Sequence, residues 1–144
     1  VSNEFVLESS NINNLRCNDT SISSLSDRRD KTEIIDSPYG LDFINSVRPV
    51  QFKWKRRKLD KLQLNPNFKD PFKDRVAVGF IAQELLEAQD NIDDTTRDIL
   101  NLVQTENPKR LEAKQSNLLP VAIKAIQELS AKVDALTKRI EALE

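Results

Sequence analysis

The sequence has no histidine and no methionine, and it has only one cysteine, Cys17. Without histidine, Ser-His-Asp and Cys-His catalysis and zinc sites that use an imidazole ligand are excluded. With one cysteine, an intrachain disulfide and a cysteine cluster for a metal or a redox pair are excluded as well. Cys17 lies among serine and asparagine residues, with Arg16 as its basic neighbour, so we interpret it as an inert thiol. Because methionine is lacking, we expect Val1 to belong to a processed chain or to a piece of a longer one.

Aromatic residues and long apolar runs are also scarce. The 144 residues are 38% hydrophobic but only 6% aromatic, which indicates one small core with an appendage. No apolar run approaches the roughly 20 residues that a membrane-spanning helix needs, so we expect no membrane partner. The 22 basic and 23 acidic side chains give a net charge of -1, whereas a general nucleic-acid binder is strongly basic. Nothing in the composition indicates a metal ion or an organic cofactor, and we expect neither.

Residues 1–25 form the first predicted region. They include 11 serine or asparagine residues and isolated aliphatic side chains, but no proline or glycine. Polar repetition and low hydrophobicity are typical of disorder. The isolated aliphatic residues are instead typical of short strands or turns that stack against something else. We favour short β segments whose partners lie upstream or in other subunits.

Residues 26–116 are predicted to form an α+β core. Ser37 and Pro38 resemble an N-cap and a first-turn residue of a helix, and apolar residues at helical spacing follow them. Residues 50–54 then alternate between apolar and polar. This period predicts a strand with one buried face, on which Trp54 lies.

The second half of this core predicts further strands. Residues 76–81 are apolar on both faces and predict a central strand that runs directly into a helix over 82–88. Asn107 and Pro108 predict a turn between the apolar alternation at 99–103 and a short segment after it, which together form a hairpin. We therefore expect one small antiparallel sheet from the segments near 50, 78, 100 and 111, with short helices near 40 and 85.

A long polar connection, residues 55–75, separates the first two predicted strands. Connections longer than about 12 to 15 residues are usually functional or mobile. This one begins with Arg56, Arg57 and Lys58, and basic residues around an aromatic side chain can bind a nucleic-acid strand. Given the balanced overall charge, we favour an exposed loop beside a buried Trp54, and we expect no nucleic-acid partner.

The last region, residues 117–144, predicts one long helix. The helix either packs on its own domain or pairs with other copies of the chain. A narrow stripe of a and d heptad positions, beside a small core, favours self-association. β-Branched residues at a with leucine at d favour two strands, so the stripe alone leaves the oligomer number open. The stripe consists of Leu119, Ala122, Ile126, Leu129, Val133, Leu136, Ile140 and Leu143.

Chemistry could occur at the start of the predicted core. Ser26 places a hydroxyl five residues before the amine of Lys31, and lysine is the known alternative to histidine as the base for a serine nucleophile. The other interpretation is that Ser26 or Asp27 caps a short turn and that the charged residues are solvated. On spacing alone, this second interpretation is the more common one.

Three motifs in this order resemble the self-cleaving C-terminal chaperone domain of phage tail spikes and fibres, such as endosialidase tail spikes and phage neck appendages. The resemblance covers about residues 22 to 144. The motifs are Ser26-Asp27-x-Arg29-x-Lys31, Gly79-Phe80-Ile81-Ala82-Gln83-Glu84, and Leu119-Pro120-x-x-Ile123-Lys124-Ala125-Ile126-Gln127-Glu128-Leu129.

The resemblance implies a function. Such a domain forms a homotrimer through a parallel coiled coil, guides the folding of the β-rich fibre that precedes it in the same polypeptide, and then cuts itself off. It implies Ser26 as the nucleophile, Lys31 as the base, Asp27 and Arg29 as supporting residues, and the bond between Leu25 and Ser26 as the scissile bond.

The resemblance also implies where each part of the chain belongs. Residues 1–25 would be the end of the mature fibre, and the loop 55–75 would project from the trimer and touch that fibre. The precursor would be associated with the virion, be assembled in the host cytoplasm, and lose this domain after cleavage.

One position departs from the family pattern. Asp30 stands where the family commonly has an aliphatic residue, and a neighbouring carboxylate favours the charged form of Lys31. Two hypotheses therefore stay open. Either burial at a subunit interface neutralises Lys31 and so times the cut, or the domain is a non-catalytic assembly module.

Overall fold

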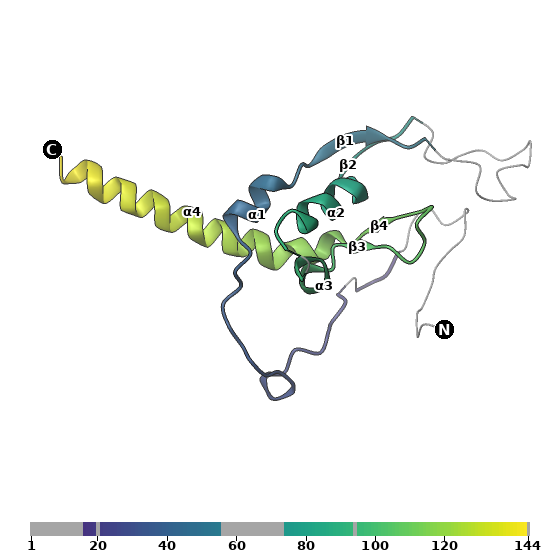
Figure 1. Cartoon of the computed structure of the whole chain (residues 1–144), viewed down its shortest axis with the longest axis horizontal. Coiled ribbons are helices and arrows are strands. Elements are labelled where there is room, and N and C mark those ends of the chain that lie inside the picture. Colours follow the sequence, from purple (N-terminus) through teal and green to yellow (C-terminus); the bar gives the residue numbers. More distant parts are fainter. Residues whose placement is uncertain (1–15, 20, 56–73, 94, 144) are drawn as a thin grey trace, which may run out of the picture. The chain divides into compact units, whose positions relative to one another are not determined.

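The computed structural model describes residues 16–19, 21–55, 74–93 and 95–143, which form an α+β fold as predicted (Figure 1). The chain divides into two compact units, and residues 35–52 together with 77–144 form the larger one. The described helices and strands are, in order, the 3-10 helix Arg28–Asp30, α1 Leu41–Ser46, β1 Val50–Lys53, β2 Val76–Gly79, α2 Ala82–Asp90, α3 Thr96–Leu100, β3 Val103–Gln104, β4 Glu112–Ala113, the 3-10 helix Gln115–Asn117 and α4 Leu118–Glu141.

The strands of the described residues form two separate two-stranded sheets, so the prediction that these four segments form one sheet is wrong. β1 pairs with β2, and β3 pairs with β4. β2 is therefore not a central strand. Val76 and Val78 lie two residues apart on one face of the strand and are 49% and 74% exposed, so this face is largely open to solvent. Trp54 lies beyond the end of β1 and is 53% exposed, not buried as predicted.

The predicted hairpin is confirmed. β3 and β4 are antiparallel, with Val103 opposite Ala113. Asn107 makes the turn, since its carbonyl accepts from the Arg110 N–H at 2.9 Å and its side chain accepts from the Lys109 N–H at 3.1 Å. Asparagine followed by proline was predicted to form a turn here, and the two hydrogen bonds of Asn107 form it.

The strand prediction extends too far towards the N-terminus, because Ile99 lies in helix α3. The Asp93 carboxylate accepts from the backbone N–H groups of Thr95 and Thr96 at 2.9 and 2.8 Å, which satisfies donors that a new helix leaves unpaired. Asn101 then adopts a left-handed conformation, with φ 47°, and ends the helix. Local capping therefore overrides the alternating pattern.

Helix α1 forms near residue 40 as predicted, but its predicted N-cap is wrong. The Ser37 hydroxyl accepts from the Tyr39 backbone N–H at 3.2 Å and makes a local turn. The N-cap is Gly40, which makes no side-chain hydrogen bond to the helix. The first turn of α1 therefore depends on another part of the chain.

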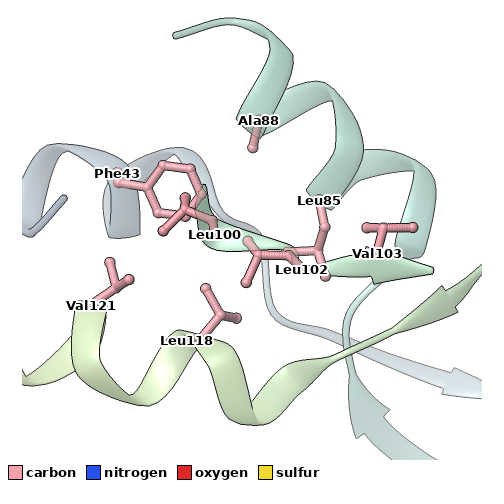
Figure 2. Close-up of a cluster of buried hydrophobic side chains, with 8 residues drawn as sticks. All are labelled: Phe43, Leu85, Ala88, Leu100, Leu102, Val103, Leu118 and Val121. Carbon is pink, nitrogen blue, oxygen red and sulfur yellow. The ribbon is translucent and has the colours of Figure 1, made fainter. Parts of the chain in front are cut away.

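Within the described residues, a hydrophobic cluster joins α1, α2, α3, the β3 segment and the start of α4 (Figure 2). Two polar side chains are also fully buried. Gln89 Oε1 accepts from the Leu102 N–H at 2.9 Å, and the Thr96 hydroxyl donates to Asp93 Oδ1 at 2.9 Å. The cluster consists of Phe43, Leu85, Ala88, Leu100, Leu102, Val103, Leu118 and Val121.

Helix α4 confirms the predicted C-terminal helix, and only its first turns pack on the core. Leu118, Val121 and Ala125, spaced by three and four, are buried against the core. The heptad stripe begins beside these buried residues and continues past the core along the exposed length of the helix. Seven of its members are each at least 50% exposed, namely Leu119, Ile126, Leu129, Val133, Leu136, Ile140 and Leu143.

Two predicted regions lie mostly outside the described residues. Of the region 1–25, residues 16–19 and 21–25 are described, and these lie in no helix or strand. Of the connection 55–75, only Lys55, Asp74 and Arg75 are described. No helix in the described part of the chain is long and apolar enough to cross a membrane.

Candidate functional site

A tight turn at residues 26–31 brings together the side chains that the sequence singles out. Asp27 has extended backbone and its carboxylate accepts from the Arg29 backbone N–H at 2.9 Å, so it caps the short 3-10 helix. The backbone N–H groups of Asp30 and Lys31 donate to the carbonyls of Asp27 and Arg28, each at 3.2 Å. This turn folds Lys31 back towards Ser26.

The Lys31 amine donates a hydrogen bond to the Ser26 hydroxyl, with 2.6 Å between Nζ and Oγ. Asp27, rather than Ser26, caps the turn. The two interpretations of this segment are therefore compatible, since the cap uses one side chain and leaves the serine hydroxyl for the lysine. Both Ser26 and Lys31 are exposed in the single chain.

The two supporting residues, Asp27 and Arg29, form a two-pronged ion pair. Arg29 Nε donates to Asp27 Oδ1 at 3.0 Å, and Arg29 Nη2 donates to Oδ2 at 2.7 Å. The guanidinium, and then the Arg29 backbone N–H, hold the pKa of the Asp27 carboxyl below its usual range. The hydrogen bond between the two side chains also raises the pKa of the Arg29 guanidinium. This ion pair stabilises the turn between Ser26 and Lys31.

We expect this turn to be sensitive to acid. The folded pKa of Asp27 is lowered, so its stabilising effect is complete above the usual aspartate pKa and is lost as the pH falls through the lowered value. In an NMR titration, the Arg29 backbone amide shift should follow the Asp27 carboxyl with a midpoint below the usual aspartate value. Asp27→Asn, which keeps an acceptor but does not titrate, should abolish this transition. A midpoint at or above the usual value would contradict the ion pair.

The residues before the predicted scissile bond are uncovered. The Leu25 side chain is 98% exposed, and that of Ile22 is 97% exposed. Among the described residues, no group of three or more cysteine, aspartate or glutamate side chains lies close enough to hold a metal ion. The chemistry that this arrangement offers is that of a hydroxyl beside an amine.

The other two motifs make contacts with α1 and with the segment after it. Glu84 of α2 pairs with Arg48, whose Nε donates to Glu84 Oε2 at 3.0 Å. Glu128 of α4 accepts from the Leu41 backbone N–H at 2.8 Å. The contact between Glu128 and Leu41 was not predicted from the sequence. The one signal for it is that Glu128 continues the spacing of the buried residues Val121 and Ala125 along α4.

Residues 26–94 match the model of a peptidase family described as chaperone of endosialidase. This part of the chain is therefore similar to the endosialidase chaperone family. Comparison with curated proteins and with solved structures gave no match. The family match begins at Ser26 and includes Lys31, β2 and α2, whereas α4 lies beyond it.

Proposed function

We propose that this endosialidase chaperone domain acts as an intramolecular chaperone of a phage tail fibre or spike. It assembles as a homotrimer through α4, templates the folding of the β-rich segment that precedes it in the same polypeptide, and releases itself by cutting between Leu25 and Ser26. The observation that carries the proposal is the 2.6 Å hydrogen bond from Lys31 Nζ to Ser26 Oγ, at the start of the family match.

The exposed stripe of α4 supports assembly. A row of aliphatic side chains that lie at least half exposed along one helix face is costly in water, and pairing with the same face of other copies removes this cost. The core holds α4 by its first turns, so the exposed part of the stripe stays available for pairing with other copies. We propose three copies because the fibre is itself three-stranded and its cap shares that symmetry.

The proposed cleavage is an attack by the Ser26 hydroxyl on the Leu25 carbonyl carbon. The hydroxyl proton passes to the neutral Lys31 amine, the Oγ–C bond forms, the C–N bond between Leu25 and Ser26 breaks, and Lys31 returns the proton to the Ser26 nitrogen. Water then hydrolyses the resulting ester, which leaves a carboxylate on Leu25 and restores the Ser26 hydroxyl. Backbone N–H groups would stabilise the negative oxygen formed in each step.

Assembly would also time the cleavage. A lysine acts as a base only after it has lost its proton, and burial favours the neutral amine. Lys31 is exposed in the single chain. A subunit interface that covers Lys31 would therefore switch the pair on after the three copies have met, when the fibre has been templated.

The alternative is a non-catalytic assembly module with the same trimer and an inactive or slow Ser26–Lys31 pair. The exposure of Lys31 in the single chain favours it. In both cases the precursor belongs to a virion component that is assembled in the host cytoplasm.

The test combines intact-mass measurement with light scattering on the purified chain over a range of concentrations. We expect a trimer, and a fragment that begins at Ser26 whose fraction rises with the trimer fraction. A trimer without this fragment would support the non-catalytic alternative. A chain that stays monomeric at all concentrations would contradict both versions.

A further inference from the structure

A carboxylate of α4 supplies the N-terminal hydrogen bond of α1. The Leu41 backbone N–H donates to Glu128 Oε2 at 2.8 Å, across 87 positions of sequence. The N-cap Gly40 offers no side chain, and the Ser37 hydroxyl is engaged with Tyr39. Helix α1 thus takes its cap from α4 and not from its own segment.

Gly40 is the residue that lets this carboxylate approach. A Cβ atom at Gly40 would lie 2.5 Å from Glu128 Oε2 and 2.7 Å from Oε1. Both distances are far shorter than van der Waals contact, so any side chain at position 40 would displace the carboxylate. Gly40 and Glu128 therefore form a matched contact, which we call the Gly40–Glu128 cap.

Helix α1 depends on α4 for its stability. It has only six residues, and isolated helices shorter than about 12 to 15 residues are marginal in water. It packs along α4 (Figure 1), and its buried Phe43 shares the core with Val121 of α4 (Figure 2). If the part of α4 that contacts α1 becomes less ordered, α1 therefore becomes less ordered as well.

Glu128 lies where the core-packed part of α4 ends and its exposed part begins. It follows Leu118, Val121 and Ala125 on the face that packs on the core, and it is itself half-buried. The next residue, Leu129, belongs to the stripe and is 50% exposed. From residue 129 to residue 143 every side chain is exposed, so this part of the helix gains its packing only when other copies cover the stripe.

We propose that the Gly40–Glu128 cap couples assembly on the stripe to the ordering of α1, and through the chain between Lys31 and α1 to cleavage at Ser26. This inference rests on the proposed function. Pairing at Leu129 holds the turn that carries Glu128, the carboxylate then stays on the Leu41 N–H, and α1 becomes fixed. Glu128 is a positioning residue in this scheme, because it contacts Leu41 and not the reacting atoms.

The test measures amide hydrogen exchange at Leu41, together with cleavage, in the full chain. Each protein is studied assembled and after dissociation by dilution, with light scattering to verify both states. In the wild type, we expect exchange at Leu41 to slow on assembly. Loss of one helix cap corresponds to about a fivefold change in an equilibrium, so Glu128→Ala should reduce this slowing, and the cleavage rate, about fivefold.

Three variants separate a positioning role from general damage. Glu128→Gln keeps an acceptor oxygen and should behave as the wild type. Gly40→Ala keeps Glu128 but displaces its carboxylate, and it should behave as Glu128→Ala. Glu141→Ala makes the same change on the exposed part of α4 and should alter nothing.

The possible outcomes distinguish this inference from the proposed function. Assembled wild type with unchanged exchange at Leu41, or Glu128→Ala indistinguishable from Glu141→Ala, would overturn the coupling alone. Coupling at Leu41 without any fragment beginning at Ser26 would overturn the proposed cleavage and leave the coupling standing. A wild-type chain that never assembles would overturn both.

Discussion

Ser26→Ala should abolish the fragment that begins at Ser26, and Lys31→Arg should slow its formation by about 10² to 10⁴-fold. The first change removes the attacking oxygen. The second keeps a positive charge near position 26 but removes the base, because an arginine does not give up its proton in a protein. The 2.6 Å contact between Lys31 Nζ and Ser26 Oγ is the structural reason to expect both effects.

The control for these variants is Ser24→Ala, which removes an exposed hydroxyl two residues before Ser26. It should cleave as the wild type does. All variants should scatter light as the wild type does, because none of the substituted side chains belongs to the stripe of α4 or to the core. Cleavage by Ser26→Ala at the wild-type rate would exclude Ser26 as the nucleophile, whatever the state of assembly.

Replacing Val133 and Leu136 together by aspartate should convert the assembly to single chains. These side chains are 53% and 55% exposed in the single chain, so the substitutions leave the core untouched. In an assembly, each buried aliphatic side chain contributes about 1.5 to 3 kcal/mol. The double variant should therefore weaken association by at least about a hundredfold per copy, and cleavage should fall with the assembled fraction.

The matched control is Ala131→Asp with Ala135→Asp, which places the same charges on the same turns of α4 but outside the stripe. Both alanines are exposed. Sedimentation velocity should show the control assembled and the stripe variant monomeric at equal concentration. Equal association of the two would mean that the stripe is not the interface, and full cleavage by a monomeric stripe variant would separate cleavage from assembly.

The elements that local sequence determines were predictable. The three-four alternation of α4, the Asn107–Pro108 turn and the helix over α2 all follow from periodicities or turn residues within a short window. The proximity of Ser26 and Lys31 was predictable for the same reason, because the short capped turn between them brings the two side chains within hydrogen-bond distance. Their catalytic role stays a prediction.

The features that the sequence did not reveal depend on distant parts of the chain or on competing caps. An apolar run such as residues 76–79 looks the same whether or not another element covers each of its faces, so the exposure of Val78 could not be predicted from it. The start of α3 is decided by the single carboxylate of Asp93 against an alternating pattern. The contact between Leu41 and Glu128 joins residues 87 positions apart, which no local window contains.

The two parts of α4, before and after residue 129, have different surroundings in the single chain. Its first turns are buried against the core, while every side chain from Leu129 to Leu143 is exposed in the single chain. The exposed side chains of the distal part of α4 can therefore be changed without altering the buried hydrophobic cluster. The change from half-buried to exposed side chains falls between Glu128 and Leu129, so a substitution at Leu129 is the first that would test the assembly surface next to the Gly40–Glu128 cap.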